Sequence, residues 1–478
     1  MTEKIKDSSF KKRWGIPLAL LAMVVTYMLL LEGPATAGLS TEGRHALVLF
    51  AGIFILFLTE PVPIVVSSLL IVPAAVLFKV CNLKMALSGF SSSSAYLLVG
   101  AFIMAVALTK TRLAERITFL ILKVTGSSVR NLTLGVTIAN IVLAFFIPSS
   151  TPRVAILLPI CLNLIALFKE EGRTKFAVNL LFTMSFTNST ISGGILTANL
   201  PNPITVEFIH NASGQVISYL DFLIVGFPPA LIMTFITWLY LQFAYPPEQS
   251  HIPGGEKLIK ESLEGMGKMS PAEWKTLCIF LGVVFLWVTG EWLGIDSTTA
   301  CLLGACLLFF PKLGVISWSE ANKGVSWQVL FICGGGVSMG AILMKTGAAE
   351  WISMLIFNHL GLSTLSTVAL IIVVLVVVQY LHVFFVGTTA MAAAMLPVLI
   401  GIATAAGLPP AMLALPGGMI IGAYPLLMFY NTIPGVLVYG TGKVVISDYP
   451  RVGIVLCGIA CLIYALCALF YWPLLGIF

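Results

Sequence analysis

Charged residues are scarce in this chain, and their scarcity excludes a water-soluble globular fold. Only 10% of the 478 residues are Asp, Glu, Lys or Arg, whereas 59% are hydrophobic. A soluble globular protein carries about 25% charged residues. Apolar runs suited to crossing a bilayer recur along the chain at Ile16–Leu31, Ala46–Leu58, Phe222–Phe243, Leu277–Val288 and Val452–Phe470. We therefore expect an all-α polytopic protein of the cell inner membrane with about eleven transmembrane helices.

Metal-binding and catalytic patterns are also missing. The nine cysteines lie mostly in apolar runs without CxxC spacing, and the five histidines form no ligand pattern. An intramembrane enzyme would need a nucleophile–base pair, paired aspartates or HExxH within the spans, and the sequence contains none. The net charge of +6 fits basic cytoplasmic loops better than nucleic-acid binding. The sequence thus favours a transporter or channel in the lipid bilayer over an enzyme.

An internal repeat is the most informative feature. Gly100–Ile117 (GAFIMAVALTKTRLAERI) and Gly335–Ile352 (GGVSMGAILMKTGAAEWI) are identical at eight of eighteen positions. A shared Lys-Thr-x-x-Ala-Glu in one register is rare between unrelated apolar spans. We expect two homologous halves, a first span before them and a linker between them. The expected segments are residues 1–42 (cytoplasmic N-terminus and first span), 43–245 (first repeat), 246–274 (cytoplasmic linker) and 275–478 (second repeat).

Loop charges predict how the two halves are oriented. With the N-terminus in the cytoplasm, the loops predicted inside hold Lys110, Arg112, Arg116, Lys123, Arg130, Arg173, Lys175, Lys257, Lys443 and Arg451. Those predicted outside hold few basic residues, chiefly Arg44, Lys84 and Lys345. This asymmetry follows the positive-inside rule. It places Lys110 inside and its repeat mate Lys345 outside, so the repeats have inverted topology, as in many secondary transporters.

Each half also contains an apolar stretch that is interrupted by small polar residues, AFFIPSSTPRVAILLPI in the first half and LHVFFVGTTAMAAAMLPV in the second. We expect a re-entrant hairpin in each, with the tips Ser149-Ser150-Thr151 and Gly387-Thr388-Thr389. Thr151 would cap a half-helix with Pro152 at its first position. Free N–H groups and the positive dipole ends of both half-helices would then form an anion pocket. Alternatively, these hydroxyls serve helix packing.

Two ionisable residues lie beside the expected tips. Arg153 falls at the second position of the first half-helix and could bind a carboxylate bidentately; the alternative is a structural ion pair. His382 lies five residues before Gly387, where a substrate contact and a packing hydrogen bond are both open.

Further on, Ser192–Pro203 and Asn431–Gly442 interrupt a later span in each half. The carbonyls of these breaks could coordinate a cation or only kink a helix. The candidate binding residues in the breaks are Asn199, Pro201, Asn202 and Pro434.

At these motifs the chain resembles the divalent anion:sodium symporter family, over nearly its whole length after the first span. The family's C-terminal stretch reads here Tyr439-Gly440, Asp448-Tyr449 and Arg451-Val452-Gly453. PSSTPR and LHVFF are most similar to the branch of citrate/succinate and tartrate/succinate antiporters and plastid 2-oxoglutarate/malate translocators. The resemblance implies a homodimer with elevator-type movement and a carboxylate anion held by both tips, of the succinate, malate, 2-oxoglutarate, citrate or tartrate class.

The chain departs from the family at both tips. Ser150 stands where the first tip has Asn, and the second tip, Gly387-Thr388-Thr389, lacks both Ser and Asn. In sodium-coupled members these side chains contribute to sodium and carboxylate contacts, and a retained Na⁺ would lie near Ser149, Ser150 and Thr388. Their loss favours anion exchange, with no cofactor other than that ion. A sodium-coupled dicarboxylate or sulfate symporter is the alternative, and an anion channel remains a further one.

Overall fold

The computed structural model of the chain describes residues 2–31, 36, 38–168 and 172–476. Over these residues the protein consists of helices and turns, with one isolated β-bridge between Ser128 and His251 and no strand. Lipid offers no hydrogen-bond partners to the backbone, and a helix pairs its own N–H and C=O groups, so uniformly apolar runs of this length favour helices. The expected all-α fold is confirmed.

Nine helical stretches among the described residues are long and apolar enough to cross a bilayer. They are Thr41–Thr59, Ser93–Thr111, Val129–Phe146, Tyr219–Ala244, Pro271–Gly290, Gln328–Lys345, Thr367–Phe384, Thr388–Ala405 and Asp448–Leu474. Shorter apolar helices accompany them at Arg13–Leu29, Ile64–Leu77, Ser150–Ala166, Ser297–Leu307 and Ala411–Ala423. The number of spans in the membrane stays a prediction, because helix length alone does not settle how the shorter pieces are placed.

After α1 (Thr2–Leu29), the helices follow one another in two similar series. The first is α2 (Thr41–Thr59), α3 (Ile64–Leu77), α4 (Leu83–Ala86), α5 (Ser93–Thr111), α6 (Leu113–Thr125), α7 (Val129–Phe146), α8 (Ser150–Ala166), α9 (Lys175–Ser192), α10 (Pro201–Ser213) and α11 (Tyr219–Ala244). The second is α13 (Pro271–Leu293), α14 (Ser297–Leu307), α15 (Trp318–Gly324), α16 (Gln328–Lys345), α17 (Ala348–His359), α18 (Thr367–Leu381), α19 (Thr388–Ala405), α20 (Ala411–Ala423), α21 (Ile433–Gly440) and α22 (Asp448–Leu466). A short α23 (Trp472–Leu474) ends the chain's helices.

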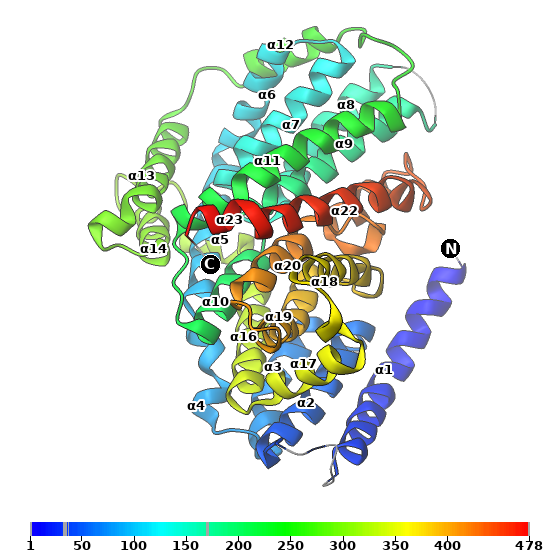
Figure 1. Cartoon of the computed structure of the whole chain (residues 1–478). Helices are drawn as coiled ribbons and strands as arrows, with labels where there is room; N and C mark the ends of the chain where they lie inside the picture. Colours follow the sequence, from blue (N-terminus) through cyan, green and yellow to red (C-terminus); the bar gives the residue numbers. More distant parts are fainter. Residues whose placement is uncertain (1, 32–35, 37, 169–171, 477–478) are drawn as a thin grey trace.

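The linker between the two series is partly helical and shorter than expected. It contains α12 (Gly255–Gly265), and α13 already begins at Pro271. A reciprocal capping box between Ser270 and Glu273 starts α13 there, four residues before the expected boundary. In Figure 1, α13 and α14 lie at one edge of the molecule and α1 at the opposite edge.

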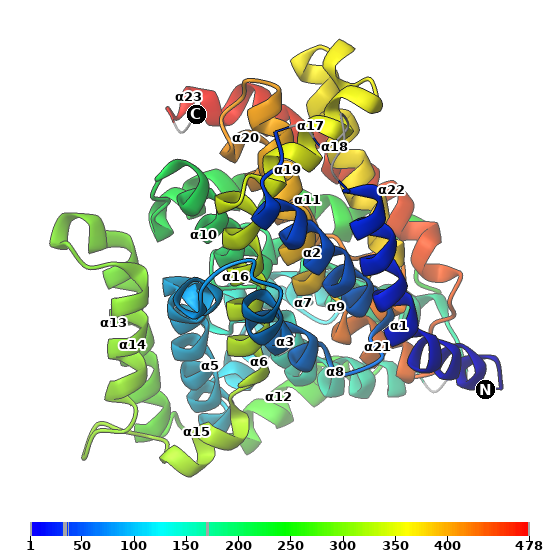
Figure 2. The same ribbon diagram turned by 90° about the horizontal axis from the view of Figure 1, so that it is seen from below.

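The corresponding helices α5 and α16 run in opposite directions. Lys110, at the C-terminal end of α5, pairs at 2.7 Å with Glu320 of α15, which directly precedes α16. At the other end, the amide of Gly89, just before α5, donates to Ser338 in the middle of α16 at 3.0 Å. In Figure 2, α12 and α15 lie toward the bottom and α17 toward the top. Inverted repeats require this arrangement, although the repeat itself stays a prediction.

Candidate functional site

The first hairpin tip is formed by the non-helical residues between α7 and α8. These are Ile147–Ser149 rather than the expected 149–151. Ser149 takes a φ of 73°, a left-handed value that residues other than glycine rarely adopt. Because the turn is completed at Ser149, α8 starts at Ser150, and Thr151 lies in its first turn instead of capping it.

Arg153 therefore occupies the fourth position of α8, not the expected second. The side chain is fully buried. Its Nη2 donates to Ser192 Oγ at 2.6 Å and to the carbonyl of Ala198 at 2.9 Å, and its Nε donates to the carbonyl of Ser149 at 3.3 Å. Among the described residues, Nη1 has no hydrogen-bond partner and no carboxylate lies within 4.0 Å. The structure thus shows no structural ion pair; the guanidinium rests on neutral oxygens.

The first break separates α9 from α10, as the sequence predicts, and spans residues 193–200. Its unwound backbone is held by amide side chains. Asn202 Nδ2 donates to the carbonyls of Ser192 at 2.8 Å and Ile195 at 2.9 Å, and Asn199 Oδ1 accepts the backbone N–H of Asn202 at 3.0 Å. Pro201, the first residue of α10, fits a helix start because its missing N–H would have no helical acceptor there.

Two amide oxygens beside this break are buried without a hydrogen-bond partner among the described residues, Asn188 Oδ1 and Asn202 Oδ1. Asn188 Nδ2 donates to the carbonyl of Ser150 at 2.9 Å, which holds α9 directly against the first tip. Hard cations are bound by oxygen ligands, so these unpaired oxygens fit a cation such as Na⁺. Asn188 and Ser192 are not among the site residues predicted from the sequence, although the polar run SFTNSTIS at 185–192 lies within an otherwise apolar span.

The second hairpin tip is displaced in the same way as the first. A 3₁₀ turn, His382–Phe384, follows α18, and the non-helical tip is Phe385–Gly387 rather than 387–389. Thr388 and Thr389 form the first turn of α19. Neither α8 nor α19 has a side-chain N-cap. The N–H groups of both first turns therefore keep their capacity to bind a ligand.

His382 packs against backbone carbonyls and is buried. Its Nδ1 lies 2.9 Å from the carbonyl oxygen of Gln379 and its Nε2 3.0 Å from that of Ile421. Asn431 reaches the same turn, since its Nδ2 donates to the carbonyls of His382 at 2.6 Å and Phe385 at 2.8 Å. These contacts favour the packing role for His382.

The second break lies earlier than the sequence suggests. It spans residues 424–432, between α20 and α21, rather than Asn431–Gly442. Thr432 accepts the N–H of Gly435 at 3.2 Å and so caps α21, which lets the helix resume at Ile433. Pro434 is consequently the buried second residue of α21 and not part of an unwound segment.

The two halves contact each other at their breaks, and the helix after each tip packs against a helix of the other half. A Cβ added to Gly422 near the end of α20 would lie 2.6 Å from Asn199 Nδ2, and one added to Gly193 would lie 2.9 Å from Ala423 Cβ. Across the halves, α8 packs against α21, and α19 packs against α10. Because α19 corresponds to α8 and α10 to α21, each tip helix lies beside the broken helix of the other half. Two halves related by a two-fold axis would produce this pattern.

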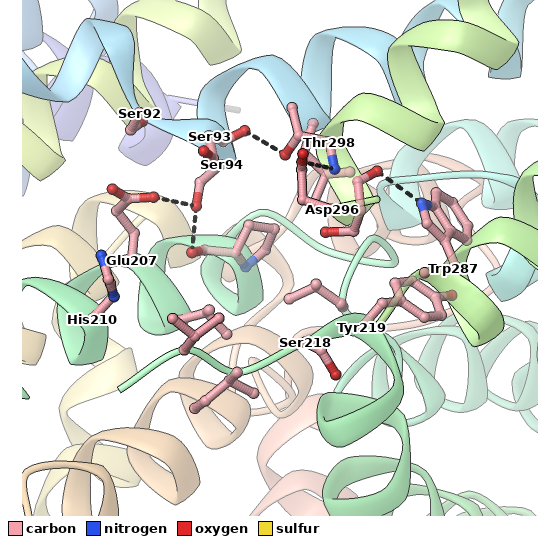
Figure 3. Close-up of a pocket in the computed structure, with 18 of the residues that line it drawn as sticks. Ser92, Ser93, Ser94, Glu207, His210, Ser218, Tyr219, Trp287, Asp296 and Thr298 are labelled. Carbon is pink, nitrogen blue, oxygen red and sulfur yellow. Dashed lines mark hydrogen bonds between the residues drawn. The ribbon is translucent and has the colours of Figure 1, made fainter. Parts of the chain in front are cut away.

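A cavity of about 670 Å³ lies beside the first break and α10, lined by Leu196 of the break and by Pro203 and Glu207 of α10 (Figure 3). Ser94 Oγ, at the start of α5, lies 2.8 Å from the Pro203 carbonyl oxygen and 3.0 Å from Glu207 Oε2. The cavity is also lined by Asp296, and its described lining contains no Lys or Arg. His210 also lines the cavity. The carboxylates of Glu207 and Asp296 repel an anion, so the tips, rather than this cavity, stay the predicted anion site.

Comparison with known families places the chain among anion transporters. The family described as "sodium:sulfate symporter transmembrane region" matches residues 11–478. A protein of Cupriavidus necator named only "membrane protein" is 28% identical over 482 residues, covering 97% of this chain and 93% of that protein.

Two further relatives have more specific names. The sodium-dependent dicarboxylate transporter SdcS of Staphylococcus saprophyticus is 29% identical and covers 92% of this chain and 87% of its own length. The chloroplastic dicarboxylate transporter 1 of Spinacia oleracea is 30% identical. The match covers 89% of this chain and 74% of that protein.

Solved structures share the fold at much lower sequence identity. The Alcanivorax borkumensis YdaH transporter is 12% identical, with a TM-score of 0.56, and covers 90% of this chain and 99% of that one. Neisseria gonorrhoeae MtrF is 13% identical, also with a TM-score of 0.56. The match covers 96% of this chain and 94% of that one.

Proposed function

The chain belongs to the sodium:sulfate symporter family, the divalent anion:sodium symporters, and we propose that it carries di- or tricarboxylate anions across the inner membrane by alternating access. The family consists of transporters, so the expectation of a transporter rather than an enzyme is confirmed. The names of SdcS and of the chloroplast relative support a dicarboxylate as the substrate.

The observation that carries the proposal is the buried guanidinium of Arg153. A buried charge without a counter-charge is costly, and Arg153 has only neutral oxygens as partners in the described structure. A substrate carboxylate would supply the missing negative charge. The Nη1 edge, which has no partner, is the part of the side chain left to meet it.

The two tips would complete the binding of a dianion. Arg153 faces one carboxylate, and the first turns of α8 and α19 offer uncapped N–H groups and the hydroxyls of Ser150, Thr151, Thr388 and Thr389. An anion that enters the membrane must replace its hydration with fixed donors. Binding of one dianion by both tips, with a carboxylate at each, is part of this proposal and rests on the family resemblance.

We propose exchange of one anion for another as the mode of coupling, because both tip asparagines of the sodium-coupled pattern are replaced. Sodium symport is the second candidate. It is supported by the unpaired oxygens of Asn188 and Asn202 and by the sodium-dependent relative. In that case Na⁺ travels as a co-substrate beside the first tip.

Orientation, movement and assembly are part of the same proposal. The N-terminus would lie in the cytoplasm with α12 and α15, and α17 at the opposite surface (Figure 2). The antiparallel α5 and α16 support two inverted repeats, residues 43–245 and 275–478. The elevator-type movement and the homodimer rest on the family resemblance.

The test is counterflow of radiolabelled succinate in proteoliposomes loaded with unlabelled succinate. We expect transient accumulation of label, inhibited by external malate, 2-oxoglutarate, citrate or tartrate and not by monocarboxylates. Sulfate is included as a competitor, because inhibition by sulfate alone would move the substrate class to inorganic anions. Non-saturable flux without counterflow would indicate a channel and refute the proposal.

A further inference from the structure

A basic cavity of about 540 Å³ lies where α9 and α22 begin, together with the end of α11. Six of its lining residues matter here: Arg173, Lys175, Phe243, Tyr245, Glu248 and Arg451. Three are cations from two segments far apart in the sequence, and in the described lining one residue, Glu248, is an acid. The cavity belongs to neither tip nor break.

The carboxylates at this cavity are already satisfied by other donors. Glu248 accepts the backbone N–H groups of Lys175 at 2.5 Å and Phe176 at 3.0 Å, so it caps α9. Asp448 behind the cavity accepts from Arg173 at 2.6 Å and from the hydroxyl of Tyr245 at 2.7 Å. Both carboxylates therefore already accept hydrogen bonds from residues that line the cavity, and they hold those residues in place.

Lys175 and Arg451 are the other two cations of this cavity. Within the described part of the chain, neither side chain forms an ion pair; Arg451 lies over the Tyr245 ring, 5.5 Å from its centroid. A guanidinium stacked in this way still presents its N–H edge to an oxyanion. Both residues are exposed. Among the described residues the cavity therefore offers a ligand two cations without an ion-pair partner, close to the N-termini of α9 and α22.

An apolar stripe on α11 leads directly to this cavity. Ile232, Phe235, Leu239 and Phe243 are all exposed and follow one another at helical spacing on one face. Phe243, which lines the cavity, is 75% exposed. In a membrane protein such a face contacts acyl chains. The stripe and the cations together have the polarity of a phospholipid, with the apolar part along the helix and the phosphate at its end.

We propose that this cavity binds the phosphate headgroup of an anionic phospholipid, with an acyl chain along the stripe Ile232–Phe243. Basic pockets between transmembrane helices on the cytoplasmic side bind such headgroups, and Lys175 and Arg451 lie in the first turns of α9 and α22, at ends predicted to be cytoplasmic. The bound lipid bridges α9 of the first half to α22 of the second. This inference is independent of which anion is transported.

The test measures lipid binding to purified, delipidated protein by native mass spectrometry. Phosphatidylglycerol and phosphatidylcholine with the same acyl chains are titrated against the parent and Lys175→Gln/Arg451→Gln. A basic residue near an anionic surface contributes about 1 kcal/mol, which is about fivefold in affinity. We expect the double variant to bind phosphatidylglycerol about thirtyfold more weakly and phosphatidylcholine unchanged.

Matched controls separate this site from general charge effects. Lys257→Gln/Lys260→Gln removes the same charge from exposed positions on α12 and should leave phosphatidylglycerol binding as in the parent. Equal binding by both double variants would overturn the proposal.

Two further arms distinguish a lipid from a soluble anion. Phe243→Gln should weaken phosphatidylglycerol binding, because it interrupts the stripe at the cavity. Inorganic phosphate and succinate, each at the same concentration, should not displace the lipid. Displacement by phosphate, together with full binding by Phe243→Gln, would mean that the cavity takes a free oxyanion and would overturn the lipid assignment.

Discussion

Arg153 in α8 and Ser192 at the end of α9 are joined by a buried hydrogen bond of 2.6 Å. This bond ties the first hairpin tip to the first break. In the second half the donor is on the break instead: Asn431, at the end of the break, donates to the carbonyl of His382 beside the tip at 2.6 Å. A tip and a break coupled in this way are expected to move as one unit, so that the donors around a substrate keep their geometry.

Replacing Arg153 tests whether its charge binds the substrate. Arg153→Gln keeps a donor for Ser192 but removes the counter-charge. A charge-assisted hydrogen bond contributes roughly 1.5–3 kcal/mol, so we expect succinate affinity to fall about ten- to a hundredfold. Arg153→Lys should recover part, because it restores the charge without the planar fork. Binding is measured by calorimetry on purified protein. Parent-like affinity in a folded Arg153→Gln protein would assign Arg153 a structural role only.

We expect Lys110 and Lys345 to lie on opposite sides of the membrane. Each is replaced singly by Cys in a background from which the nine native cysteines have been removed, and impermeant maleimide is applied to sealed, oriented vesicles. Because α5 and α16 are antiparallel, we expect Lys110→Cys to label from the cytoplasmic side and Lys345→Cys from the other. Labelling of both from one side would refute the inverted repeat.

Exchange predicts uptake without sodium. Vesicles loaded with succinate should take up labelled succinate equally in sodium and in potassium or choline buffer, since neither tip carries the asparagine of the sodium-coupled pattern. Unloaded vesicles should take up little under any gradient. If uptake into unloaded vesicles appears with an inward sodium gradient, the exchange mode is wrong; Asn188→Ala and Asn202→Ala then become the variants expected to raise the sodium requirement.

The sequence predicted the broad architecture because lipid leaves few choices. Apolar runs in a chain with so few charges must be helices, and the repeat of Lys-Thr-x-x-Ala-Glu located two corresponding helices, α5 and α16, that the structure shows to be antiparallel. Those predictions depend on patterns that are local in the chain. Family resemblance then supplied the function class.

Details of the tips could not be predicted in the same way. Both tips lie two residues earlier than expected, because Ser149 adopts a left-handed backbone and Gly387 an extended one, and preferences for helix caps do not reveal either. Two of the three hydrogen-bond partners of Arg153 are 39 and 45 residues away. Only folding brings Ser192 and Ala198 to it, so the sequence allowed an ion pair that the structure does not show.

Asn431 should be needed for the stability of the second tip. In Asn431→Ala the carbonyl of Phe385 loses the side-chain donor that the structure gives it, while the carbonyl of His382 keeps the backbone N–H of Phe385 at 3.1 Å. An unpaired buried polar group costs about 1–3 kcal/mol. We expect a lower melting temperature and lower transport. Asn358→Ala, at an exposed position on α17, is the matched control and should melt like the parent. Equal melting of the two variants would show that the amide of Asn431 does not hold the tip.

Gly340 should tolerate no side chain, because α16 touches α10 there. A Cβ added to Gly340 would overlap the ring of Phe208, which is buried. Overpacking of this kind costs about 1–3 kcal/mol, and because α10 follows the first break, transport should fall as well.

Gly282→Ala on α13 is the control: a Cβ there meets nothing within 4 Å, and alanine in a helix should stabilise by about 0.5–1 kcal/mol. Melting temperatures in detergent should therefore move in opposite directions. Phe208→Leu added to Gly340→Ala should recover part of the loss if the clash is the cause; parent-like melting of Gly340→Ala would show that the two helices are not packed as closely as the structure has them.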